Sequence, residues 1–154
     1  MTKRIQLSAH FTLDELTRSA TAQKYGIKNE PSQIEKVSLV NLCVFLLEPL
    51  RGQLGRPVAI NSGYRCPVLN AKVGGVANSQ HTRGQAADIN CASQSAAKET
   101  VLAVLRGRID FDQMIVEQTG SRWWIHVSYV GPNKNRREIL GLGKLIVNNK
   151  FTLL

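Results

Sequence analysis

The sequence predicts an α+β domain in which about three helices pack against a small, mostly antiparallel sheet. Helical segments with capping signals alternate with short apolar runs in the order helices, strand, loop, strand, helix and hairpin. The runs 111–117 and 122–130 flank "QTGS", which is typical of a β-hairpin. A chain of 154 residues, 43% of them hydrophobic, suits one domain over 1–154 with a single core.

Two shorter helices are predicted from local signals. Thr12 and Glu15 form a capping box ahead of an apolar face, which predicts a helix over about 13–24 that ends at Gly26. The segment 93–108 has helical periodicity and begins with serine, so it is the last predicted helix.

The remaining predicted helix is long and largely buried. Ser32 and Glu35 repeat the capping box, and apolar residues follow until Pro49, which should kink or shorten the helix before it closes near residue 55. No window of the sequence approaches about 18 consecutive apolar residues, so we expect no membrane insertion.

The strands are shorter and the segment between them is unusual. Apolar runs predict strands at 57–61 and 86–92, in addition to the hairpin. Between them, 62–84 is rich in Gly, Asn and Ser, with one helical turn near 67–73. Long loops inside compact domains are usually functional or disordered. The basic and apolar tail, 131–154, carries no function that the sequence reveals.

The charge of the chain restricts its partners. Twenty Lys and Arg against eleven Asp and Glu give a net charge of +9. This favours a polyanionic partner, which includes nucleic acid, an anionic membrane surface and cell wall. A nucleic-acid partner is not expected, because no Lys/Arg stripe is interleaved with aromatic residues.

The stretch "SQHTRGQAAD", residues 79–88, is either a surface loop or part of a metal site. His81 and Asp88 lie seven residues apart, and Gly84 would let the backbone between them turn sharply. His126, in the second hairpin strand, could complete the three-ligand set that catalytic zinc sites use. Spacing alone leaves both interpretations open.

A wider pattern around these residues resembles a known family. "SGYRCPVLNAKVGGVANSQHTRGQAADI" followed by "WIHVSY" resembles the zinc peptidases of peptidoglycan typified by D-alanyl-D-alanine carboxypeptidases and L-alanyl-D-glutamate endopeptidases, including phage endolysins. "FTLDELTRS" and "PLRGQLGRPVAINSGYR" are also similar, so the resemblance covers about residues 11–130. The positions that match the family motif are Ser79, His81, Gly84, Ala86, Asp88, Trp124 and His126.

The resemblance implies a hedgehog/DD-peptidase-like fold and a site with one zinc ion, for which His81, Asp88 and His126 would be the ligands. It also implies that Arg65, in "SGYR", orients the substrate and stabilises the developing oxyanion. The alternative for Arg65 is a structural pair with an acidic residue. The implied reaction is hydrolysis of an amide bond in a peptidoglycan stem peptide, by carboxypeptidase or endopeptidase action.

The general base is where this sequence departs from the family. Many relatives have an acid three residues before the last histidine, where this chain has Trp123. Relatives with a similar "FDQ-I-x-E" strand favour Glu117, and the alternatives are Asp112 or a water with no acid nearby. A hairpin that turns at "TG" would pair Glu117 near Arg122, about 13 Å along the ladder from His126.

Several expectations about biology complete the prediction. The N-terminal "MTKRIQLSAHFTLDEL" has no apolar stretch of a signal peptide, so we expect a protein that stays cytoplasmic until lysis or is carried by a virion, and that acts on the cell wall. Separately, we expect a monomer. A bacterial enzyme used inside the cell is a further possibility. A different class of protein, a non-catalytic zinc-containing module that binds cell wall, is the alternative function.

Overall fold

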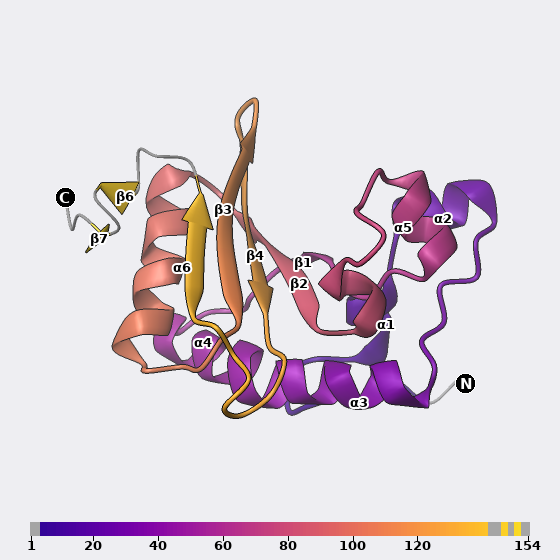
Figure 1. Cartoon of the computed structure of the whole chain (residues 1–154), viewed down its shortest axis with the longest axis horizontal. Coiled ribbons are helices and arrows are strands. Elements are labelled where there is room, and N and C mark those ends of the chain that lie inside the picture. The colour runs from indigo at the N-terminus through magenta and orange to yellow at the C-terminus, as the bar shows by residue number, and fades with distance from the viewer. Residues whose placement is uncertain (1–3, 142–145, 148–149, 152–154) are drawn as a thin grey trace.

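A five-stranded sheet with strand order β1-β2-β4-β3-β5 forms the centre of the molecule (Figure 1). The computed structural model describes residues 4–141, 146–147 and 150–151. The central strands are β1 Ile60–Ser62, β2 Ala86–Cys91, β3 Gln113–Thr119, β4 Arg122–Ser128 and β5 Glu138–Gly141. Neighbouring strands are antiparallel except β3 and β5, which are parallel. The predicted α+β class with a mostly antiparallel sheet is therefore confirmed.

The helices are more numerous than predicted. They are α1 Leu13–Thr17, α2 Ala20–Tyr25, α3 Gln33–Leu42, α4 Glu48–Leu54, α5 Pro67–Lys72 and α6 Gln94–Arg106, with a π-helical turn η1 Cys43–Leu47 and a 3-10 turn η2 Gln80–Arg83. The helix expected over 13–24 is wrong as one element. Arg18 is extended, and the side chain of Ser19 accepts a hydrogen bond from Ala22 N, so a second helix begins there.

The long helix runs unbroken from Gln33 to Leu54 as α3, η1 and α4. Its capping box at Ser32 and Glu35 is confirmed, but Pro49 does not shorten it. In the π turn just before this proline, Glu48 N donates to Cys43 O, which lets the helix continue past the proline ring.

By length and composition alone, this long helix could cross a membrane, although a core helix passes the same test. One side of it is fully buried in the core, through Leu39, Leu42, Cys43, Leu46, Leu47 and Leu50. We expected no segment of this kind, and the absence of membrane insertion stays a prediction.

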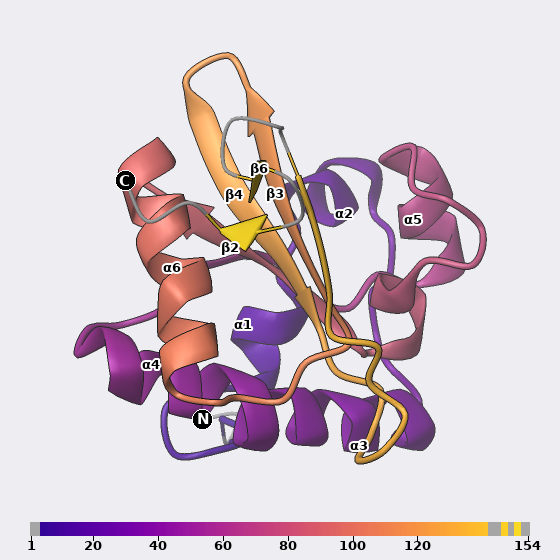
Figure 2. The ribbon, with the colours of Figure 1, turned by 60° about the vertical axis from the view of Figure 1, so that its left-hand side comes forward.

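One face of the sheet is packed and the other is open. Ile125 and Val127 of β4 and Met114 and Val116 of β3 are buried in the core. Helix α6 runs alongside the strands and the long helix crosses beneath them (Figures 1 and 2). Because side chains alternate along a strand, the residues between the buried ones lie on the opposite face. His126 is one of them, so any site that includes it opens away from the core.

The segments outside the regular sheet differ most from expectation. The helical turn expected near 67–73 is present as α5, and the loop 62–84 also contains η2, which was not expected. The tail 131–154, for which we made no prediction of structure, supplies β5 at the edge of the sheet and a two-stranded pair, β6 Ile146–Val147 with β7 Lys150–Phe151. The sheet is therefore extended by a part of the chain that lies beyond the family resemblance.

Candidate metal centre

His81 is presented by the short turn η2 and held rigidly. Ser79 caps the turn, because its Oγ accepts a hydrogen bond from His81 N at 3.3 Å. The imidazole is 2% exposed, and its Nδ1 lies 2.7 Å from the carbonyl oxygen of Gly63. A carbonyl oxygen only accepts, so Nδ1 carries the proton and Nε2 has a free lone pair.

Asp88 and His126 come from neighbouring strands and are direct register partners in the β2–β4 ladder. Asp88 Oδ1 lies 3.3 Å from His81 Nε2 and 3.4 Å from His126 Nδ1. No two of these three atoms are more than 4.8 Å apart, and they form the one such cluster among the residues that the structure describes. The sequence-predicted ligand set is therefore brought together.

The three side chains fit a tetrahedral zinc ion. With zinc–ligand bonds of about 2.0–2.1 Å, two tetrahedral ligands are about 3.3 Å apart, close to the two separations measured here. Asp88 Oδ1 is buried and has no hydrogen-bond partner among the described residues. Burial would raise the pKa of Asp88, but the two histidines lower it below its ordinary value, so the carboxylate is charged.

Arg65 lies beside this cluster with part of its guanidinium unused. Its Nε is buried and makes no hydrogen bond to any residue that the structure describes. Burial lowers the pKa of Arg65, and the negative charges of Asp88 and Glu117 act in the opposite direction. Arg65, Asp88 and Trp124 line a cavity of about 570 Å³ on the open face. No ion pair is formed between Arg65 and an acid within the described chain, which favours the substrate-binding role.

Asn29, which the sequence did not single out, fixes the backbone around Arg65. Its Nδ2 donates to Thr17 O at 2.8 Å and to Tyr64 O at 2.9 Å, and its Oδ1 accepts from Cys66 N at 2.8 Å. The residues before and after Arg65 are thus clamped by one side chain. No sequence pattern marks such a residue, because its partners lie 12 to 37 positions away.

Glu117 lies closer to the metal ligands than the sequence suggested. The hairpin turns at Gly120 and Ser121 with Thr119 opposite Arg122, so Glu117 pairs with Trp124 and not near Arg122. The earlier separation of about 13 Å is wrong, because Glu117 is a diagonal neighbour of His126, at about 7–8 Å. Its Oε2 accepts a hydrogen bond from Trp124 Nε1 at 2.5 Å, and this tryptophan does not bond to the other carboxylate oxygen, Oε1.

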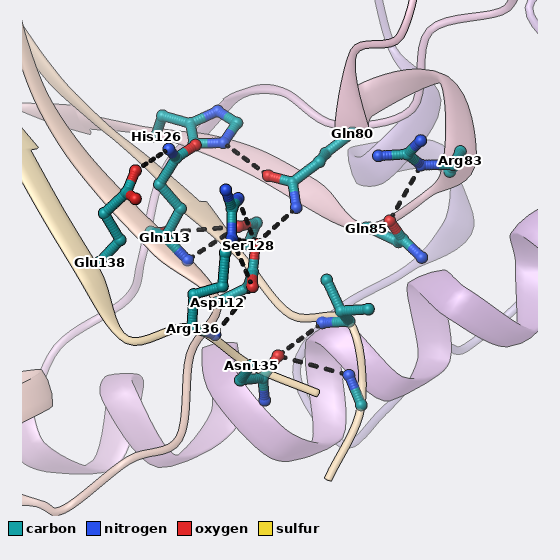
Figure 3. Close-up of polar contacts among 12 residues, drawn as sticks. Gln80, Arg83, Gln85, Asp112, Gln113, His126, Ser128, Asn135, Arg136 and Glu138 are labelled. Carbon is teal, nitrogen blue, oxygen red and sulfur yellow. Dashed lines mark hydrogen bonds and ion pairs between the residues drawn. The ribbon is translucent and has the colours of Figure 1, made fainter. Parts of the chain in front are cut away.

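Asp112, the alternative base, is engaged elsewhere. It is 2% exposed, and Arg136 Nη2 and Gln80 Nε2 each donate to its Oδ2 at 2.8 Å (Figure 3). Burial would raise the pKa of Asp112, but these hydrogen bonds outweigh it and lower the pKa. A carboxylate that is fully occupied by an arginine is a poor proton acceptor, so the arrangement favours Glu117.

Three other polar residues of the motif region have different outcomes. Ser79, a position of the family motif, caps η2 as described. Gln85 accepts a hydrogen bond from Arg83 Nε at 3.1 Å and contacts none of the ligands through its side chain. Gln80, which we did not predict, lies 3.4 Å from His126 Nε2 through its Oε1. His10 lies apart from this site and pairs with Glu48 at 2.8 Å.

Fold and site together define a class: an α+β domain with a mononuclear His/Asp/His metal site that opens into a cavity, as in metal-dependent hydrolases. The chain belongs to the Peptidase M15 family, whose sequence model matches residues 9–128. It is 34% identical over 86 residues to the zinc D-Ala-D-Ala carboxypeptidase of Streptomyces albus G, a match that covers 55% of this chain and 32% of that protein. The chain therefore spans about a third of that relative, and the family resemblance drawn from the sequence is confirmed.

Proposed function

We propose that the protein is a zinc-dependent peptidase that hydrolyses an amide bond in the stem peptides of peptidoglycan. The observation that carries the proposal is the convergence of His81, Asp88 and His126 beside a cavity, in a chain of the Peptidase M15 family. The name of the relative from Streptomyces albus G includes zinc and D-Ala-D-Ala. We propose the same metal and the same class of substrate for this chain.

The ligands would hold one zinc ion through His81 Nε2, Asp88 Oδ1 and His126 Nδ1. Two neutral imidazoles and one carboxylate leave such a site with a net positive charge. A bound zinc ion supplies a Lewis acid and lowers the pKa of a water ligand toward about 7. With three protein ligands, a fourth position stays available for water or substrate.

Glu117 and Arg65 would do the remaining chemistry. Trp124 holds Glu117 Oε2, so the other oxygen would accept a proton from the attacking water and return it to the leaving amine. Arg65 would donate hydrogen bonds to the scissile carbonyl oxygen, on which negative charge develops during attack. The buried, unpartnered Nε of Arg65 supports this assignment, because a substrate oxygen would satisfy it.

We place this activity in cell-wall degradation during phage lysis, by an enzyme that is cytoplasmic until lysis or carried by the virion. The support is the net charge of +9, which suits a carboxylate-rich wall polymer, together with the resemblance to phage endolysins.

Digestion of purified peptidoglycan, with products identified by mass, tests the proposal. Wild type should release new amino groups, and Glu117→Gln should lower the rate by about 10²–10⁴-fold with zinc still bound. Glu99→Gln is the matched control, since Glu99 pairs with Arg56 on the surface of α6 and should keep full activity. Loss of a terminal residue would identify a carboxypeptidase, and internal cleavage an endopeptidase.

The outcome that would contradict catalysis is binding to peptidoglycan, with zinc present, and no release of amino groups from any wall type. That result would identify the protein as a non-catalytic wall-binding module. The zinc ligands have their own control: His81→Ala should abolish zinc binding, and His10→Ala should leave it unchanged, because His10 pairs with Glu48 outside the site.

A further inference from the structure

Gln80 connects His126 to the ion pair between the buried Asp112 and the exposed Arg136 (Figure 3). Its Oε1 lies 3.4 Å from His126 Nε2, and its Nε2 donates to Asp112 Oδ2 at 2.8 Å. Arg136 closes the chain of contacts, because its Nε and backbone N donate to Asp112 Oδ1 at 3.1 and 2.9 Å and its Nη2 donates to Oδ2 at 2.8 Å. Four residues from four separate places in the sequence thus form one connected network.

The chemistry of the partners sets the direction of every hydrogen bond in this network. A carboxylate that faces an arginine only accepts, so the Gln80 amide must turn its NH₂ toward Asp112 and its oxygen toward His126. That oxygen can only accept, so His126 Nε2 must carry the proton. The lone pair is then on Nδ1, the atom 3.4 Å from Asp88 Oδ1.

We infer that Gln80, Asp112 and Arg136 are positioning residues that hold His126 in the tautomer with Nδ1 free to bind a metal. Metal-binding histidines commonly donate their other N–H to a carboxylate or carbonyl, and loss of that partner costs about 10–100-fold in metal affinity. Here the carboxylate acts through a glutamine. His81 receives the same support from the backbone of Gly63, so only His126 depends on side chains.

Arg136 gives the C-terminal part of the chain a role in the site. The family match ends at residue 128, and Arg136 lies beyond it. Backbone hydrogen bonds from Arg137 N to Phe111 O and from Glu138 N to Asp112 O, at 3.2 and 2.9 Å, fix this segment beside Asp112. The parallel pairing of β5 with β3 continues from the same point. A segment outside the family match therefore completes the support of one family ligand.

The inference rests on the proposed function only for the identity of the metal, and its first test needs neither metal nor substrate. Nitrogen-15 NMR of the metal-free protein at pH of about 8, where an ordinary imidazole is neutral, reports the tautomer of His126. Wild type should show the proton on Nε2. Gln80→Leu and Asp112→Asn should show a mixture of tautomers, whereas Asp110→Asn, which disrupts a neighbouring Asp–Arg pair with Arg137, should match wild type.

Zinc affinity, measured by competition with a chelating indicator, is the second test. Gln80→Leu and Asp112→Asn should each bind zinc about 10–100-fold more weakly than wild type. The double variant should be no weaker than Gln80→Leu alone, because Asp112 acts through Gln80. Arg136→Met should weaken zinc binding and Arg136→Lys should restore much of the loss, with Arg137→Met as the control.

Two results would overturn the inference. One is an unchanged tautomer of His126 in Gln80→Leu. This variant tests the inference by itself if Asp112→Asn does not fold. The other is a double variant whose losses in zinc affinity add, since that would make the two residues independent. Failure of the peptidase proposal is distinguishable from both, because it would appear as absent peptidoglycan cleavage with the tautomer of wild type intact.

Discussion

Replacing Gly84 with alanine should destabilise the fold and weaken the metal site together. Gly84 closes the turn that carries His81, with φ of +69°, and an added Cβ would lie 2.5 Å from the carbonyl oxygen of Glu35 and 3.2 Å from Leu39 Cγ. Both neighbours belong to α3. Since one of them is helix backbone, it cannot turn aside as a flexible side chain would, and either the turn or the helix must move.

The size of the effect follows from two contributions. A left-handed backbone costs a residue with a Cβ about 1–2 kcal/mol, and forcing an extra methyl group into a packed contact costs about 1–3 kcal/mol. The lower flexibility of alanine in the unfolded chain returns about 0.4–1 kcal/mol. We therefore expect Gly84→Ala to lower the free energy of unfolding by about 2–4 kcal/mol.

Gly55→Ala separates the two contributions. Gly55 ends α4 with φ of +66°, and an added Cβ there would have nothing within 4 Å. This variant should lose only about 1 kcal/mol, from backbone strain alone. Urea denaturation of the metal-free proteins measures both losses, and zinc affinity should fall only in Gly84→Ala. Equal losses in the two variants would refute the reasoning, because the close approach of the turn to α3 would then cost nothing.

Three further predictions concern the metal and two polar networks. A chelator should lower the melting temperature of wild type but not of His81→Ala, because zinc at 100 times its Kd contributes about 2.7 kcal/mol. Asn29→Ala should lower kcat on peptidoglycan with unchanged zinc affinity, and cost about 1–3 kcal/mol of stability, since the backbone clamp on Arg65 is lost. The pKa of Asp112 is lowered on folding, so its stabilising effect should be complete above the ordinary carboxyl pKa of about 4 and lost as pH falls through the lowered value. Urea unfolding of wild type and Asp112→Asn at successive pH values should show the difference shrinking below that point.

Features set by neighbouring residues were predictable from the sequence. The side-chain cap at Thr12 and the full capping box at Ser32 form, and the glycine at position 55 ends the long helix. The two hairpin strands also form where their alternating pattern predicts them, with His126 between buried neighbours. These signals are local, because a cap or an alternating strand is decided within about four residues.

Features set by distant residues were not predictable. Ser19 begins a second helix because its cap competes with continuation of the first, and periodicity alone does not reveal which wins. Gln80 and Asn29 have partners up to 46 and 37 positions away, respectively. Arg136 reaches the site because the strand that follows it, β5, pairs parallel to β3. No local sequence pattern before β5 predicts this pairing.

The position of Glu117, the proposed proton acceptor, depends strongly on the register of the hairpin. Residue 123, where many relatives have an acid, is a tryptophan that is 8% exposed on the core-facing side of β4. An acid at that position in this register would be buried away from the ligands. The acceptor must come from the open face, where Glu117 is one strand from His126 and Glu138 is two strands away. A turn shifted by one residue would place Glu117 on the packed face, because side chains alternate along a strand. The two-residue turn at Gly120 and Ser121 is thus what places a carboxylate beside the proposed metal site.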